Sequence, residues 1–159
     1  MQLINKIAVL LLLLSSFSIS AQPAHVFQYQ IKQPMSQVYD RLYKGLEDDG
    51  FYVVFEVNIG KNLARFAEKW GENYNRNKLD GIRSMVFCNG WYANAVSNAD
   101  PTMLALCPLS LSLIEKQGIT HVLFARPSVM AGESPALKLL SRVENDVIAI
   151  IKKTMLENN

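Results

Sequence analysis

Apolar and polar residues alternate along several short stretches of the chain, which is the pattern of half-buried β-strands. In the clearest of these stretches, Phe51, Val53, Phe55, Val57 and Ile59 are expected to share one face. The alternation predicts strands over residues 25–32, 51–59, 82–88 and 119–126, and over residues 104–114 with Pro108 at a sheet edge or a bulge, because proline cannot donate to a central ladder.

Apolar residues at a spacing of three or four predict four helices between these strands. The first runs from Pro34 to Gly50, the second covers residues 63–70, the third follows Asn89 as far as Pro101, and the last spans residues 134–156. Asn89 can cap the third helix with its side-chain oxygen. Residues 73–81 are polar and are expected to form a loop.

The resulting order of elements is βαβαβαββα, with a hairpin between the last two strands. Strand pairs joined by a short turn are antiparallel, and amphipathic helices bury their apolar faces against a sheet. The sequence therefore predicts an α+β fold with helices packed on a mostly antiparallel sheet.

The first 21 residues have the pattern of a secretory signal peptide. Lys6 precedes an apolar run over residues 7–14, and small residues lead to Ala21, after which we expect cleavage, with Ala24 as the second choice. The run is shorter than the roughly 20 residues that a membrane-spanning helix needs. We therefore expect one domain over residues 22–159, periplasmic or secreted, with no stable membrane anchor after cleavage; an uncleaved anchor is the alternative.

The charge of the chain excludes two classes of partner. Sixteen Lys and Arg residues stand against 14 Asp and Glu residues in 159, a formal net charge of +2. A domain that binds nucleic acid or an anionic membrane by electrostatics carries a basic patch or a strong positive excess. We therefore expect no nucleic-acid partner and no electrostatic binding to an anionic membrane surface.

The two cysteines, Cys88 and Cys107, lie beyond the expected leader. An even number of cysteines in an exported chain favours a disulfide, and closing a loop of about 20 residues would stabilise the fold by about 3 kcal/mol. The alternative is two separately buried thiols, because free cysteine packs as a small apolar residue. No Cys-x-x-Cys redox motif occurs in the sequence.

Catalytic motifs are missing from the sequence. Its two histidines are His25 and His121, and it contains no zinc-binding His-Glu-x-x-His, no glycine-rich phosphate loop and no nucleophile elbow. His121 shares a predicted strand face with Ile119 and Leu123. A core or interface histidine is one interpretation of this position, and a ligand-binding residue is the other. The sequence thus indicates no catalytic residue and no metal site, and it leaves the cofactor unknown.

Four short motifs resemble the signature of domain-of-unknown-function family 302: Cys-Asn at 88–89, Trp-Tyr-Ala-Asn-Ala at 91–95, Ala-Asp-Pro at 99–101 and Leu-Cys-Pro-Leu at 106–109. The Ala-Arg-Pro-Ser run at 125–128 is similar to the same family, whereas Gly90 stands where many relatives have proline. The resemblance implies an α+β fold of the TATA-binding-protein-like class and association as a homodimer. It implies no activity, and a shared fold does not imply DNA binding.

The two cysteines flank the helix that carries Trp91 and Tyr92. Sulfur atoms and aromatic rings at such a junction can enclose a small apolar pocket. The alternative is that the aromatic rings simply close the core. The candidate ligand-binding residues are Cys88, Asn89, Trp91, Tyr92, Cys107 and His121.

Two classes of function fit these observations. The sequence favours an exported, non-catalytic module that binds a small ligand or a partner protein. The alternative is a thiol-based redox, sulfur-handling or metal-handling protein that uses Cys88 and Cys107. A structural homodimer without a ligand is the third possibility, and the sequence does not identify the ligand.

Overall fold

Five strands form one antiparallel sheet in the order β1-β5-β4-β3-β2. A computed structural model describes residues 24–156 of the chain, so the expected signal peptide over residues 1–21 lies outside the described residues. The sheet and its helices confirm the α+β class. The strands are β1 (Val26–Ile31), β2 (Tyr52–Val57), β3 (Gly81–Cys88), β4 (Leu109–Lys116) and β5 (Ile119–Ala125).

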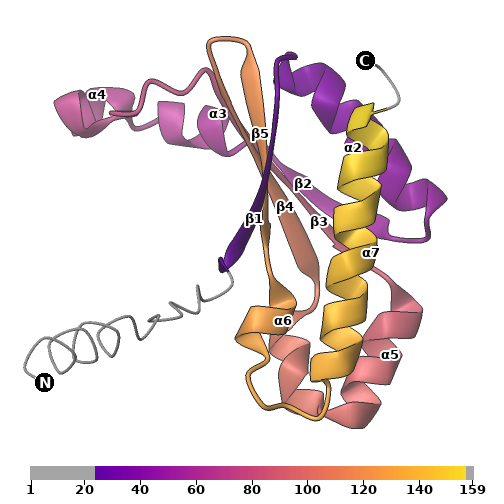
Figure 1. Cartoon of the computed structure of the whole chain (residues 1–159). Coiled ribbons are helices and arrows are strands. Elements are labelled where there is room, and N and C mark those ends of the chain that lie inside the picture. Colours follow the sequence, from indigo (N-terminus) through magenta and orange to yellow (C-terminus); the bar gives the residue numbers. More distant parts are fainter. Residues whose placement is uncertain (1–23, 157–159) are drawn as a thin grey trace, which may run out of the picture.

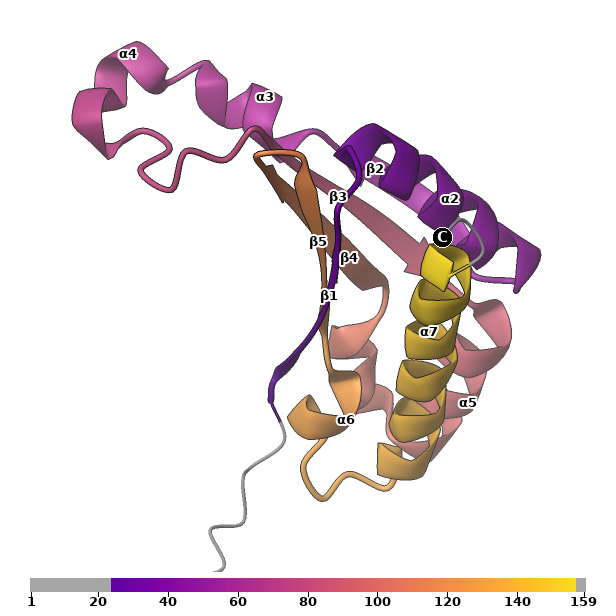
Figure 2. The same ribbon diagram turned by 45° about the horizontal axis from the view of Figure 1, so that its top comes forward.

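Helices cover one face of this sheet only (Figure 1, Figure 2). The covering helices are α2 (Met35–Asp48), α5 (Gly90–Ala99) and α7 (Leu137–Leu156), whereas α3 (Ile59–Ala64) and α4 (Ala67–Trp70) project away from the body. The remaining helical segments are α6 (Pro127–Met130) and the 3-10 helices η1 (Gly71–Asn73) and η2 (Pro101–Leu106). Within residues 24–156, no helix is long and apolar enough to cross a membrane.

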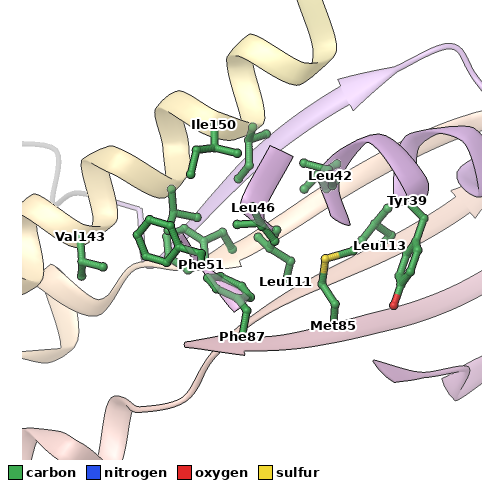
Figure 3. Close-up of a cluster of buried hydrophobic side chains, with 14 of the residues drawn as sticks. Tyr39, Leu42, Leu46, Phe51, Met85, Phe87, Leu111, Leu113, Val143 and Ile150 are labelled. Carbon is green, nitrogen blue, oxygen red and sulfur yellow. The ribbon is translucent and has the colours of Figure 1, made fainter. Parts of the chain in front are cut away.

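The core fills the space between the sheet and the helices α2 and α7 (Figure 3). Alternate residues of the central strands point into it, because side chains of a strand alternate between the two faces. Leucine and valine side chains of α2 meet them from the apolar stripe that the sequence predicts. The fully buried members of this core include Val38, Leu42, Leu46, Met85, Phe87, Leu111, Leu113, Val122, Val147 and Ile151.

The helices α2 and α7 approach each other closely at Gly45. A Cβ atom added to Gly45 would lie 2.3 Å from Cγ2 of Thr154 on α7. No real Cβ tolerates that distance, so the absence of a side chain at this position sets the spacing of the two helices.

The strand β2 differs from its expected pattern at Phe55. Its register against β3 shifts between Val53 and Phe55, so an extra residue interrupts the alternation. Phe55 is consequently 59% exposed and does not share the face of the buried Phe51. The expectation of one common face fails here because strict alternation takes no account of a bulge.

The predicted strand over residues 104–114 is shorter than expected. Residues Pro101–Leu106 form η2, whose first turn Asp100 caps by accepting from the amide of Thr102 at 3.0 Å. Strand β4 begins at Leu109, so Pro108 precedes the strand and occupies neither an edge nor a bulge. Cys107 therefore lies in the junction between η2 and β4.

Candidate functional site

The sulfur atoms of Cys88 and Cys107 lie 3.6 Å apart. Cys88 ends β3 and Cys107 closes η2, and the pairing of Phe87 with Leu109 brings these two ends together. A disulfide requires a separation of about 2.05 Å between the sulfur atoms. The pair is therefore adjacent and unbonded, and the disulfide stays a prediction.

A small apolar cavity of about 30 Å³ adjoins the two cysteines. Its wall combines the ends of β3 and β4 with η2 and with one face each of α5 and α7. A volume of this size holds one or two water-sized particles. The lining residues are Phe51, Phe87, Cys88, Asn89, Tyr92, Ala93, Val96, Met103, Leu106, Cys107, Leu109, Leu140 and Val143.

Asn89 fixes the first turn of α5 against the rest of the site. Its side-chain oxygen accepts from the amide of Tyr92 at 3.1 Å, which is the predicted N-cap. Its side-chain nitrogen donates to the carbonyl oxygen of Gly50 at 3.0 Å. The amide group is therefore engaged at both ends, and Asn89 shapes the wall of the cavity.

Tyr92 closes the cavity on the side of α5. Its ring stacks on Phe51 with 6.1 Å between ring centroids, and its hydroxyl donates to Asp146 on α7. Burial, together with the hydrogen bond to Asp146, raises the pKa of Tyr92 to about 12. The phenol therefore stays protonated at neutral pH and acts as a fixed part of the wall.

Two of the predicted site residues lie outside the cavity. Trp91 packs edge-on against Tyr92 with 5.0 Å between ring centroids, and it is 60% exposed. His121 lies on β5 opposite Ile114, which pairs in turn with Ile82, six positions before Cys88 on β3. The structure thus brings together Cys88, Asn89, Tyr92 and Cys107 and separates His121 from them.

Met103 is a lining residue that the sequence analysis did not select. It lies in η2, and its thioether adds a third sulfur-bearing side chain to the cavity. The Asp-Pro-Thr run at 100–102, an N-cap residue followed by proline, is the signal that predicts a helical turn there. The prediction of a strand over residues 104–114 overlaps the end of η2, so this helical turn was not predicted.

The cavity disfavours negative charge on Cys107. Burial raises the pKa of the Cys107 thiol to about 11, and the adjacent Cys88 raises it further as a hydrogen-bond partner and by its charge. The thiolate is the nucleophilic form of cysteine. Cys107 is therefore a poor nucleophile at neutral pH.

A family model described as "Domain of unknown function DUF302" matches residues 27–154. The chain belongs to the DUF302 family. This assignment confirms the resemblance carried by the motifs at 88–89 and 106–109, which contribute both cysteines of the site.

A solved DUF302 structure has the same fold. The crystal structure of an uncharacterized conserved DUF302 protein from Bacillus stearothermophilus superposes with a TM-score of 0.71 at 17% sequence identity. The match covers 83% of this chain and 99% of that one. A comparison with curated proteins finds no match. The DUF302 relationship therefore establishes the fold, and the function has to be argued from the site.

Proposed function

We propose that the protein is an exported, non-catalytic binding module whose ligand occupies the cavity beside Cys88 and Cys107. The observation that carries this proposal is the 3.6 Å approach of two thiols in the wall of an apolar cavity. Export is supported by the leader pattern of residues 1–21.

The size of the cavity limits its ligand. Pockets for drug-sized molecules measure about 300–1,000 Å³, whereas this cavity measures about 30 Å³. Its ligand accordingly consists of one or a few heavy atoms. Sulfur atoms are the most polarisable groups in the wall, so the ligand is one that bonds to sulfur.

The chemistry of the wall supports a binding role over a catalytic one. Among the lining residues the titratable groups are Cys88, Cys107 and Tyr92. Burial raises the pKa values of Cys107 and Tyr92 to about 11 and about 12, so both stay protonated at neutral pH. A general base or a nucleophile needs a pKa closer to the working pH.

Arsenite is the probe that tests this proposal, because As(III) condenses with two adjacent thiols and releases water without any change in oxidation state. We expect the reduced protein to form one adduct per chain in native mass spectrometry, and to melt at a higher temperature with arsenite present. Reduced, folded protein that forms no adduct would overturn the proposal.

A matched pair of valine substitutions makes the test specific to the cavity. Val96→Ile adds one methylene group to a lining residue and is expected to weaken arsenite binding at least tenfold. Val147→Ile makes the same change at a fully buried position that does not line the cavity, and is expected to leave the affinity unchanged. Equal loss in both variants would contradict a site in the cavity.

Thiol redox chemistry is the second candidate, because two sulfurs at 3.6 Å can join by exchange with the disulfide of a partner molecule, which takes up the two electrons and two protons and is reduced to two thiols. Such a role requires a reactive thiolate, and the raised pKa of Cys107 opposes it. Alkylation by N-ethylmaleimide at pH 7 separates the two functions. A binding site predicts slower modification than that of a small free thiol, whereas faster modification favours the redox role.

We further propose that the protein is a homodimer that associates through the helix-free face of the sheet (Figure 2). One cross-strand row on that face, formed by Gln28, Leu123, Ser112, Ser84 and Val57, contains no Lys, Arg, Asp or Glu, whereas the row of Lys116 and Ile119 at the end of the β4–β5 ladder carries one charge. A row without charge can meet the same row of a second copy without like-charge repulsion, and interface cores are depleted in charged residues.

Sedimentation tests this association. Phe55 is 59% exposed on β2, and Phe55→Glu would place like charges at a two-fold interface, so we expect monomers. Met130→Glu makes a similar change at an equally exposed position on α6 and is expected to leave a dimer. A wild-type protein that sediments as a monomer would contradict the homodimer.

A further inference from the structure

We infer, on the basis of the proposed function, that the ligand is a monovalent soft metal ion, Cu(I), bound by the sulfur atoms of Cys88, Cys107 and Met103. These three side chains line the same cavity, and two of the sulfurs lie 3.6 Å apart. The inference names the substrate class of that site and gives Met103 a role.

The donor set selects the metal. Thiolate and thioether sulfurs are soft ligands that favour Cu(I), whereas Ca²⁺ and Mg²⁺ require oxygen ligands. Structural Zn²⁺ takes four ligands from cysteine, histidine and carboxylate side chains. Within residues 24–156 no three His, Cys, Asp or Glu residues gather into such a group. The cavity therefore suits an ion that accepts a low coordination number and sulfur donors.

The separation of the two thiols favours three-coordination. With metal–sulfur bonds of about 2.3 Å, sulfurs 3.6 Å apart subtend an angle of roughly 100° at one ion. A linear two-coordinate ion would need its sulfurs about 4.6 Å apart, twice the bond length. The angle leaves room for a third ligand, and Met103 is the remaining sulfur-bearing residue in the wall.

Backbone hydrogen bonds fix the position of Met103 in the wall of the cavity. Met103 lies in η2, whose start is fixed by Asp100, and the amide of Met103 itself donates to the carbonyl oxygen of Asp100 at 3.1 Å. The same 3-10 helix ends at Leu106, and Cys107 is its C-cap residue. Two of the three proposed ligands thus belong to one short, capped segment.

The binding step conserves charge and oxidation state. Two thiols lose their protons to solvent, two copper–thiolate bonds form, and copper remains Cu(I). The resulting site carries one negative charge, which the positive N-terminal end of α5, beginning at Gly90 directly after Asn89, partly offsets. Because protons leave, the affinity rises with pH.

Anaerobic titration of the protein, isolated from its host and fully reduced, with Cu(I) held in a chelator buffer tests the inference. We expect one Cu(I) per chain, three sulfur scatterers in the copper X-ray absorption spectrum, and no binding by Cys88→Ser or Cys107→Ser. Met103→Leu keeps the size of the side chain and is expected to weaken binding at least tenfold and to leave two sulfur scatterers.

Met130→Leu is the matched control, because Met130 is exposed on α6 and does not line the cavity. Unchanged affinity in Met103→Leu, or three sulfur scatterers retained by that variant, would overturn the assignment of Met103. Reduced protein that forms the arsenite adduct but binds no Cu(I) would overturn the metal assignment and leave the proposed function standing. Failure with both probes would overturn both.

Discussion

The carboxylate of Glu144 accepts a hydrogen bond from Nε of Arg126 at 2.7 Å while its side chain is only 2% exposed. The second carboxylate oxygen accepts from the amide of Ser128 at 3.0 Å and from its hydroxyl. The contact joins the end of β5 and the start of α6 to α7. The sequence predicts no role for the Ala-Arg-Pro-Ser run at 125–128, which is similar to the family. In the structure this run holds α7 against the end of β5.

Replacing Glu144 by Gln is expected to destabilise the fold by about 2–3 kcal/mol, because a charge-assisted hydrogen bond is lost. The amide NH₂ of glutamine would also face an N–H donor of Arg126 or Ser128 in the buried site. Urea unfolding at pH 7 measures the difference. Glu133→Gln makes the same change at an exposed position and is expected to alter the stability by less than about 0.5 kcal/mol. An equal effect in both variants would contradict the role of the buried pair.

The same carboxylate makes the stability depend on pH. Burial alone would raise the pKa of Glu144, but hydrogen bonds from Ser128 and Arg126 outweigh it, so the pKa lies below its usual value of 4.5. A lowered native pKa means that the unfolded chain binds the proton first, so the contribution is complete above pH 4.5 and is lost as the pH falls through the native pKa.

The gap in unfolding free energy between the wild type and Glu144→Gln should therefore be constant between pH 6 and 8 and should narrow progressively below about pH 4.5. Urea titrations at pH 7, 4 and 3 measure it. A gap that stays the same at pH 3 would show that charge on Glu144 is not the cause.

Gly45→Ala is expected to destabilise the fold by about 1–3 kcal/mol, although alanine is the better helix former, because the new Cβ would overlap Cγ2 of Thr154. Thermal unfolding measures the effect. Gly90→Ala serves as the control: nothing lies within 4 Å of a Cβ at that position in α5, so we expect no loss of stability.

A double variant separates the overlap from other causes. Thr154→Ser removes Cγ2 and retains the hydroxyl that donates to the carbonyl of Ile150 at 2.8 Å. Gly45→Ala should therefore cost less in the Thr154→Ser background than in the wild type, with a coupling of about 1 kcal/mol. Additive effects would rule out this contact.

Oxidation of the cysteine pair is expected to raise the free energy of unfolding by about 3 kcal/mol, because a bond between Cys88 and Cys107 would close a loop of about 20 residues in the unfolded chain. Comparison of oxidised and reduced protein in urea measures this, with Cys107→Ser under both conditions as the control. Oxidised protein should also bind no Cu(I), since its thiols are consumed. Equal stability of the two redox states would contradict the prediction.

Strict periodicity explains which parts of the fold the sequence predicts. The alternation of buried Leu111 and Leu113 with serines, and the stripe of Val38, Leu42 and Leu46, each reflect one regular element against one core. Phe55 departs from this pattern because a bulge is a property of the paired strand, not of the strand's own sequence. Alternation alone could therefore not predict which face of the sheet Phe55 occupies.

The site was predictable in part for a similar reason. Cys88 and Tyr92 are one turn apart across a recognisable helix cap, so local sequence places them together. The pairing of β3 with β4 brings Cys107 to them. The even number of cysteines suggested that Cys88 and Cys107 would be close. Met103 and His121 depend on tertiary placement: η2 carries the first into the cavity, and the pleat turns the second to the other face.

The pairing of β1 with β5 has a consequence for biosynthesis. Val26 meets Ala125 and Ile31 meets Thr120, so the first strand of the described chain is held by the last one to be synthesised. Such a distant contact forms late, since closing a long loop costs entropy before any pairing is gained. The sheet can therefore close only after β5 has left the ribosome, and until then β1 has no partner strand.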